Sequence, residues 1–252
     1  MNLLPILHQK LLFTTEDIAR EIGNSQSAAT LLWRYQRQGY ISQVRRGLYC
    51  VNNIATKQPE ATKFQIASAI TPTSYVAYHA AMEYHGLSHQ VYLDVVAGSE
   101  QAFKAFDFDN HHYVPHLSAI QLFIETPLAD THVRVTSVER TIVDCIDRSD
   151  LCGGWEELVN CLKAVQYINE NQLLIVLQAY NKTALYKKVG FLLEQLQLPV
   201  SPEFLTTCRK HAKDSVTYFT SDGSSDTFNA DWRLYAPHDL LTINGQNTHD
   251  LV

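Results

Sequence analysis

The chain has 252 residues, 46% of them hydrophobic, and a formal net charge of −6, which is enough material for one large or two ordinary domains with buried cores. No stretch approaches the roughly 18 uncharged apolar residues of a membrane span. His8 and Lys10 interrupt the apolar N-terminus, so we also expect no signal peptide.

The charge is unevenly distributed along the chain. Residues 1–57 hold seven basic and three acidic side chains, a net of +4, whereas residues 58–252 hold 13 basic and 23 acidic side chains, a net of −10. This asymmetry suggests that the N-terminal segment binds a polyanion and that the acidic remainder does other work.

The N-terminal segment is predicted to fold as three helices followed by a hairpin. The predicted elements are a helix over residues 5–12, a helix from Thr14 or Thr15 to Ile22, a Gly23-Asn24 turn, a helix from a Ser25 cap to near Gln38, and strands over residues 40–44 and 48–51. Gly39 is placed to end the third helix. This order predicts a winged helix-turn-helix, a fold that places one helix in the major groove of DNA.

The third helix is the predicted reading element. Ala28, Leu32 and Tyr35 form one apolar stripe, which Leu31 widens, so the opposite side faces outward. Glutamine pairs with adenine, arginine with guanine or phosphate, and serine or threonine with either, while a helix N-terminus favours a phosphate. We therefore predict DNA contacts from the polar residues of this helix, namely Ser25, Gln26, Ser27, Thr30, Arg34 and Arg37.

The hairpin is the predicted wing. Arg45 and Arg46 stand at its tip before Gly47, where two fixed positive charges would lie along the phosphate backbone or in the minor groove. Winged helices also serve as protein-interaction modules, so a protein-interaction role stays open as an alternative hypothesis.

Residues 52–60 are polar and contain a proline, so we place a linker there and expect domains over residues 1–57 and 61–252. The second domain is expected to be a mixed α/β domain that becomes mostly helical, which makes the whole chain α+β, with a polar, mobile tail after Leu241. Its predicted helices span residues 61–70, 74–85, 138–146, 155–167, 170–180, 184–196 and 202–211, and its strands 91–97, 119–126, 132–136, 216–220 and 231–235, the last two as a hairpin.

The sequence lacks the residue patterns of several common kinds of functional site. The five cysteines form no CxxC pair, and we interpret them as buried, reduced thiols of a cytosolic protein. His111, His112 and His116 are the densest histidine cluster, but no second ligand pair stands at a recognised spacing, so we expect a polar loop or strand pair and no metal. No glycine-rich phosphate loop or nucleophile elbow occurs, so neither a cofactor nor an enzyme activity is expected.

Three segments resemble the AbiEi antitoxins of type IV toxin-antitoxin (abortive infection) systems. They are the winged array ending in Arg45-Arg46-Gly47-Leu48-Tyr49, the segment from Ser74 to Leu87 with its His85-Gly86-Leu87 end, and the run from Ser137 to Asp144. The segment from Ser137 to Asp144 also has a structural interpretation, because the spacing of Arg140 and Asp144 favours an ion pair within a helix. The resemblance spans about residues 5–150.

The resemblance implies a repressor that binds repeats in its own promoter, and the reduced thiols lead us to expect it in the cytoplasm. It also implies a neighbouring nucleotidyltransferase-type toxin that the C-terminal region antagonises, in several cases without a stable complex. A single winged domain has limited contact area, so two copies on an inverted repeat of double-stranded DNA are compatible with it. The remaining alternative is an enzyme acting on nucleic acid or nucleotide that carries a winged targeting domain, for which converging acids in a deep pocket would be the sign.

Overall fold

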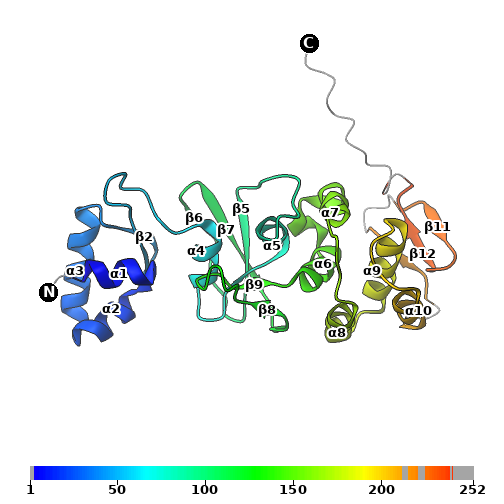
Figure 1. Ribbon diagram of the computed structural model, residues 1–252, viewed down its shortest axis with the longest axis horizontal. Coiled ribbons are helices and arrows are strands. Elements are labelled where there is room, and N and C mark those ends of the chain that lie inside the picture. Colours follow the sequence, from blue (N-terminus) through cyan, green and yellow to red (C-terminus); the bar gives the residue numbers. More distant parts are fainter. Residues whose placement is uncertain (1–2, 212–214, 221–224, 239, 241–252) are drawn as a thin grey trace, which may run out of the picture. The chain divides into compact units, whose positions relative to one another are not determined.

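The computed structural model describes residues 3–211, 215–220, 225–238 and 240 (Figure 1). The chain divides into two compact units, Met1–Ala80 with Tyr92–Val135, and Ala81–Val91 with Thr136–Val252. Among the described helices, none combines the length and the apolar character that crossing a bilayer requires. The predicted mobile tail after Leu241 lies outside the described residues, and the predicted domain boundary near residues 57–61 stays a prediction.

The winged helix-turn-helix predicted for the N-terminal segment is present. Its elements are α1 Leu4–Lys10, β1 Leu12–Thr14, α2 Thr15–Ile22, α3 Ser25–Arg37, β2 Ile41–Arg45 and β3 Leu48–Val51. The three strands form an antiparallel sheet in the order β1-β3-β2. The sequence prediction had no strand at β1, which is only three residues long and owes its extended form to pairing with β3.

Local side chains define the ends of the helices. The Thr14 hydroxyl accepts from the Asp17 N–H while the Asp17 carboxylate accepts from the Thr14 N–H, a capping box that begins α2. Gly23 ends α2 with φ of 75°, a backbone angle that favours glycine. The cap of α3 is Asn24, whose Oδ1 accepts from the Ser27 N–H, and not Ser25 as predicted; Ser25 is the first helical residue.

The winged domain has its own hydrophobic core. The inward faces of the three helices and the strands bring together Leu3, Leu7, Phe13, Ile18, Ala28, Leu32, Tyr35, Ile41 and Val51. The Tyr35 hydroxyl accepts a hydrogen bond from the Leu3 N–H at 3.2 Å, so the polar end of this buried ring is satisfied. The predicted stripe of α3 is therefore the stripe that packs.

The rest of the first unit is built on a sheet in the order β6-β7-β5-β4-β9-β8, with α4 Lys63–Ala69 and part of α5 Tyr78–Tyr84. Its strands are β4 Tyr75–Val76, β5 Asp94–Ser99, β6 Phe106–Phe108, β7 His111–Leu117, β8 Ile124–Glu125 and β9 Val135–Thr136. The continuous helix predicted over residues 74–85 is wrong: its first residues pair as β4, and Tyr78 begins α5 with φ of 55°.

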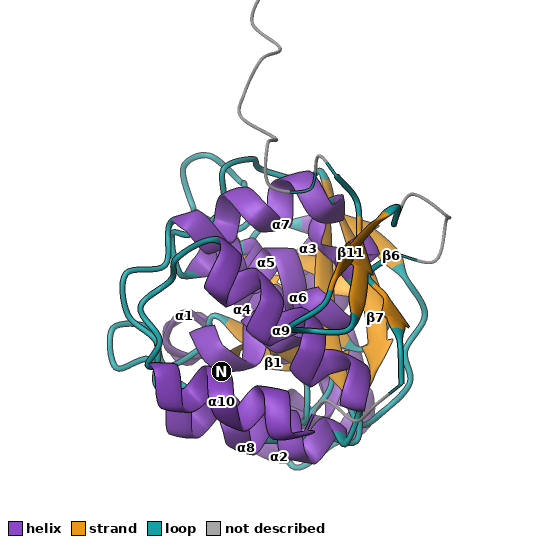
Figure 2. Ribbon diagram, turned by 90° about the vertical axis from the view of Figure 1, so that its right-hand side faces the viewer, coloured by secondary structure: helices purple, strands orange, loops and turns teal. Residues whose placement is uncertain are grey.

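The second unit is mostly helical (Figure 2). It contains α6 Val138–Asp147, a 3-10 turn at Ser149–Cys152, α7 Gly154–Lys163, α8 Glu170–Tyr180, α9 Thr183–Gln195 and α10 Pro202–His211, followed by strands β10 Thr217–Tyr218, β11 Thr227–Asn229 and β12 Leu234–Ala236. The predicted closing hairpin is wrong, because β10 runs parallel to β12 and β11 pairs with the other side of β12. The overall α+β class, winged at the start and helical towards the end, is confirmed.

Candidate nucleic-acid interface

The outward side of α3 carries every polar residue that the sequence assigned to DNA contact on this helix. These side chains, all exposed, are Ser25, Gln26, Ser27, Thr30, Arg34 and Arg37. Ala28, Leu32 and Tyr35 on the opposite side are buried. Because a helix turns about 100° per residue, fixing the buried stripe fixes which residues face outward.

Two grooves flank α3. One, with a volume of about 360 Å³, is lined by Gln26, Ser27, Thr30 and Arg34 of the helix together with the apolar side chains of Leu3, Ile22 and Leu31. The other, of about 510 Å³, lies between α3 and the wing and is lined by residues that include Trp33, Gln36, Gln43, Arg46 and Tyr49. The helix is therefore a ridge between two hollows, a shape suited to entering a groove of DNA.

The two arginines of the wing have different surroundings. Arg46 is exposed and lines the groove beside α3, next to Gly47, whose φ of 84° makes the turn. The Arg45 guanidinium lies 5.7 Å from the ring centre of Phe103 and 5.5 Å from that of Phe106. Its Nη1 atom is buried, with no hydrogen-bond partner among the described residues. Arg45 therefore packs on the body of the first unit, and Arg46 is the cation that the wing presents to solvent.

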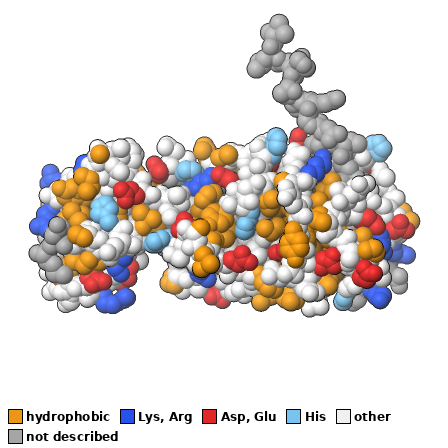
Figure 3. Space-filling view, in the orientation of Figure 1, with side chains coloured by type: hydrophobic (Ala, Val, Ile, Leu, Met, Phe, Trp, Pro, Cys, Tyr) orange, Lys and Arg blue, Asp and Glu red, His pale blue; other side chains and the backbone are white. Residues whose placement is uncertain are grey.

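The arginines on the outward side of α3 and at the tip of the wing lack, among the described residues, the acidic neighbours that other basic residues of the winged domain have. Lys10 lies 3.7 Å from Glu21, and Arg20 lies 3.7 Å from Asp17, so both have acidic neighbours. Within the part of the chain that the structure describes, Arg34, Arg37 and Arg46 have no carboxylate within 4.0 Å. Figure 3 shows Lys and Arg side chains around the left-hand edge of the molecule, where Figure 1 places α3. The charges of Arg34, Arg37 and Arg46 are therefore available to an external anion.

Asp17, at the start of α2, is held by hydrogen bonds with Thr14. Burial alone raises the pKa of Asp17, but hydrogen bonds from the Thr14 backbone and hydroxyl, with Lys10 and Arg20 nearby, bring the net pKa below its usual value of 3.8. Asp17 therefore stays ionised and serves the helix cap.

One exposed aromatic residue on this surface was missed by the sequence reasoning. Trp33 is 59% exposed in the middle of α3, and the Arg37 guanidinium stacks over its ring at 4.9 Å. The sequence contained a sign of this exposure, because Trp33 falls outside the stripe of Ala28, Leu32 and Tyr35. The prediction of DNA contacts considered only polar side chains and therefore did not include it.

The histidine cluster is a strand pair. His111, His112 and His116 lie on β7, which pairs with β6 across a turn in which Asp109 and Asn110 both have positive φ. Each histidine has its own partner: the Asp109 carbonyl for His111, the Asp107 carboxylate at 2.7 Å for His112, and the Tyr78 hydroxyl at 2.9 Å for His116. The three rings bind different neighbours and do not converge.

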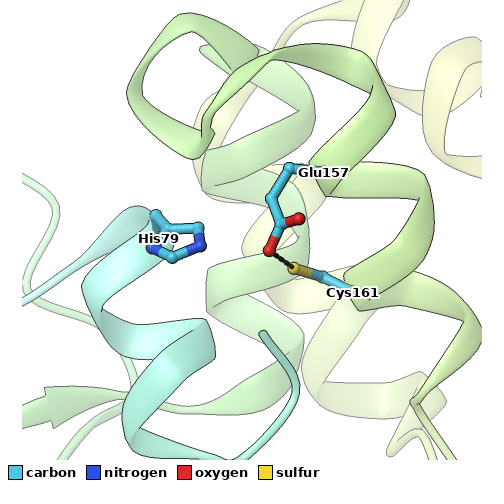
Figure 4. A group of neighbouring side chains, drawn as sticks. All are labelled: His79, Glu157 and Cys161. Carbon is cyan, nitrogen blue, oxygen red and sulfur yellow. Dashed lines mark hydrogen bonds between the residues drawn. The ribbon is translucent and has the colours of Figure 1, made fainter. Parts of the chain in front are cut away.

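In the second unit, buried polar groups serve the fold. All five cysteines of the chain are buried free thiols, as predicted. Cys161 donates to the Glu157 carboxylate (Figure 4). The same carboxylate also accepts from the backbone N–H groups of His89 and Gln90. The predicted ion pair is present: Arg140 Nε lies 2.5 Å from Asp144 Oδ1, and both side chains are buried.

A cleft of about 550 Å³ in the second unit has two acids in its lining, Asp147 and Asp150. Each is already paired: Lys182 Nζ lies 2.7 Å from Asp147, and Arg148 donates two hydrogen bonds to Asp150. The charges of both carboxylates are therefore neutralised by neighbouring cations, and this arrangement does not favour a catalytic site.

Comparison with known proteins agrees with the winged domain. Residues 2–52 match a protein family described as "Transcriptional regulator, AbiEi antitoxin"; the motifs at residues 74–87 and 137–144 lie beyond that match. No curated protein matches the chain. The crystal structure of the RV2827C protein from Mycobacterium tuberculosis shares the fold, with a TM-score of 0.64 and 16% sequence identity over 96% of this chain and 91% of that one. The similarity to the AbiEi antitoxin transcriptional regulators is therefore a property of the winged domain, residues 2–52.

Proposed function

We propose that this protein is a DNA-binding repressor and the antitoxin of a type IV toxin-antitoxin system. In this proposal it binds inverted repeats in its own promoter and antagonises a nucleotidyltransferase-type toxin. The observation that carries the DNA-binding part is the outward side of α3, where Arg34 and Arg37 are exposed without acidic partners among the described residues, while Arg46 of the wing is exposed in the groove beside the helix. The antitoxin part rests on the family match of residues 2–52.

The contacts divide by position on this surface. Ser25, Gln26, Ser27, Thr30 and Arg34 lie in the first three turns of α3 and would meet bases and phosphates in the major groove. Arg37 and Arg46 would hold phosphates on the side of the wing. Arg45 was predicted as a second phosphate contact; its stacking on Phe103 and Phe106 supports instead a role in holding the wing in place.

The adjacent arginines provide a matched test of this interface. Each cation that neutralises a phosphate adds about 0.9 to the slope of log binding constant against log salt concentration. We expect Arg46→Ala to weaken binding to all sequences and to lower that slope by about 0.9, and Arg45→Ala to leave the slope as in wild type. The measurement is fluorescence anisotropy of full-length protein on the DNA upstream of its own reading frame, at several salt concentrations.

Arg20→Ala serves as the control, because Arg20 is exposed, lies on α2 and has Asp17 beside it. It should bind as wild type does. If the wild-type protein shifts no upstream DNA even at low salt, DNA binding is refuted and the winged domain is a protein-interaction module. Equal slopes for the Arg46→Ala variant and wild type would refute the assignment of the wing.

A further inference from the structure

Trp33 occupies the central position of the outward side of α3. Gln26, Thr30, Trp33 and Arg37 follow one another at spacings of four, three and four, so they form a single stripe along the helix. This stripe is opposite the buried stripe of the same helix. Any ligand that meets α3 along its length meets the indole ring of Trp33 halfway.

The exposure of this ring has no explanation within the winged domain. Burial of a large aromatic side chain is among the stronger contributions to stability, and a tryptophan in a fold of this size is usually well buried. Trp33 is 59% exposed, although apolar side chains elsewhere in the winged domain form a compact core. An exposed ring among cations fits a surface that a polyanionic partner covers.

The neighbours of Trp33 favour DNA over a protein as that partner. The Arg37 guanidinium stacks over the ring, and the groove on the side of the wing adds Gln36, Gln43 and Arg46 together with one acid, Glu16. Cations and amides therefore outnumber the acid around the indole. In the major groove, the only apolar group that a base pair presents is the C5-methyl of thymine. An aromatic ring flanked by phosphate-binding cations matches that combination.

We infer that Trp33 is a specificity-determining residue that packs against a thymine methyl group in the major groove, with Arg37 stacked on it and directed to the adjacent phosphate. The inference rests on the proposed DNA binding and adds a base preference to it. It assigns thymine recognition to the middle of α3, between contacts made by Thr30 and Arg34 on one side and the wing on the other.

The experiment removes the methyl group from the DNA and the ring from the protein. Duplexes bound by the full-length protein are first selected from a randomised library, and each thymine is then replaced by deoxyuracil, which lacks only the methyl group. Loss of one buried methyl should weaken wild-type binding about fourfold at one position per half-site. Trp33→Ala should weaken binding about tenfold and should no longer distinguish thymine from deoxyuracil there.

The control is Ile54→Ala, because Ile54 is an apolar residue of similar exposure, 60%, outside α3. It should bind as wild type does, and circular dichroism should show that all variants are folded. Wild-type binding that Arg46→Ala weakens but Trp33→Ala leaves unchanged would overturn the inference, with a protein partner as the occupant of this ring, while the proposed function stands. Thymine discrimination that persists in Trp33→Ala would also overturn it. Failure of wild type to select any duplex would refute the proposed function itself.

Discussion

Arg45 and Arg46 are neighbours of identical chemistry with different roles in this structure. The sequence indicates a basic tip to the hairpin and treats the two side chains alike. The structure directs Arg45 to the rings of Phe103 and Phe106, which are more than 50 residues away in the chain, and leaves Arg46 exposed. The distinction depends on a contact between distant residues, and no local pattern in the sequence contains it.

Arg140 and Asp144 show the opposite case, in which spacing alone was sufficient. Residues four apart on a helix are neighbours, so the ion pair was predictable before the fold was known. What the sequence did not contain is Tyr180 of α8, whose hydroxyl donates to the same Asp144 oxygen at 2.5 Å and whose ring lies beside the Arg140 guanidinium. The pair is completed by a residue 36 positions away.

We predict that replacing two arginines of the second unit lowers the free energy of unfolding by unequal amounts. Arg140→Ala leaves the Asp144 carboxylate buried without its cation and should lower the free energy of unfolding by about 3–5 kcal/mol. Arg148→Ala removes a pair whose side chains are 49% and 61% exposed and should cost no more than about 1 kcal/mol. Urea unfolding followed by circular dichroism measures both, and equal costs would contradict a structural role for the buried pair.

Among the elements, the helices were easier to predict than the strands. Caps, glycine stops and apolar spacing are local signals, and the predicted α3 and α6 to α10 agree with the structure to within a few residues. The strands β1 and β4 are three and two residues long and exist because other strands pair with them. Periodicity has too few residues to act on in such short elements, which is why the segment of β4 was assigned to a helix.

Helix α9 packs closely against the ring of Trp232. Gly190 lies in the middle of α9, and a methyl group there would overlap the Trp232 ring. That ring cannot easily move, because its Nε1 donates to Glu194 at 2.6 Å and Arg209 stacks over it at 4.6 Å. Gly190→Ala should therefore cost about 3 kcal/mol by overpacking, more than the about 1 kcal/mol that alanine gains in helix propensity.

The sign of that effect should reverse when the ring is removed. In a Trp232→Leu background, Gly190→Ala should become neutral or stabilising, because only the helix propensity remains. Thermal and urea unfolding of the four members of this cycle measure the coupling. Destabilisation of the same size in both backgrounds would show that the ring is not what excludes a side chain at this position.

The charge of the whole chain divides into a basic N-terminal segment, +4 over residues 1–57, and an acidic remainder, −10 over residues 58–252. In the proposed function one winged domain offers only α3 to the major groove, so we predict that two chains bind one inverted-repeat duplex, each on its own half-site. Half-sites centred about 10 base pairs apart, or a multiple of this, place both helices on one side of the DNA.

Sedimentation of the full-length protein with its selected duplex gives the stoichiometry. Two chains should bind a duplex with both half-sites, and one chain should bind a duplex in which one half-site has been scrambled. Saturation of the intact duplex by a single chain would contradict this mode of binding and leave the contacts of the individual winged domain intact.

The sequence by itself determined the winged fold of the first 51 residues, the buried and outward sides of α3, the five buried thiols and the Arg140–Asp144 pair, because caps, helical periodicity and residue spacing act over a few positions. The tertiary structure decided the strand pairing of β1 and β4, the parallel approach of β10 to β12, and the separate surroundings of Arg45 and Arg46. These depend on which distant residues meet, and the free energy of such contacts is set only when the chain has folded.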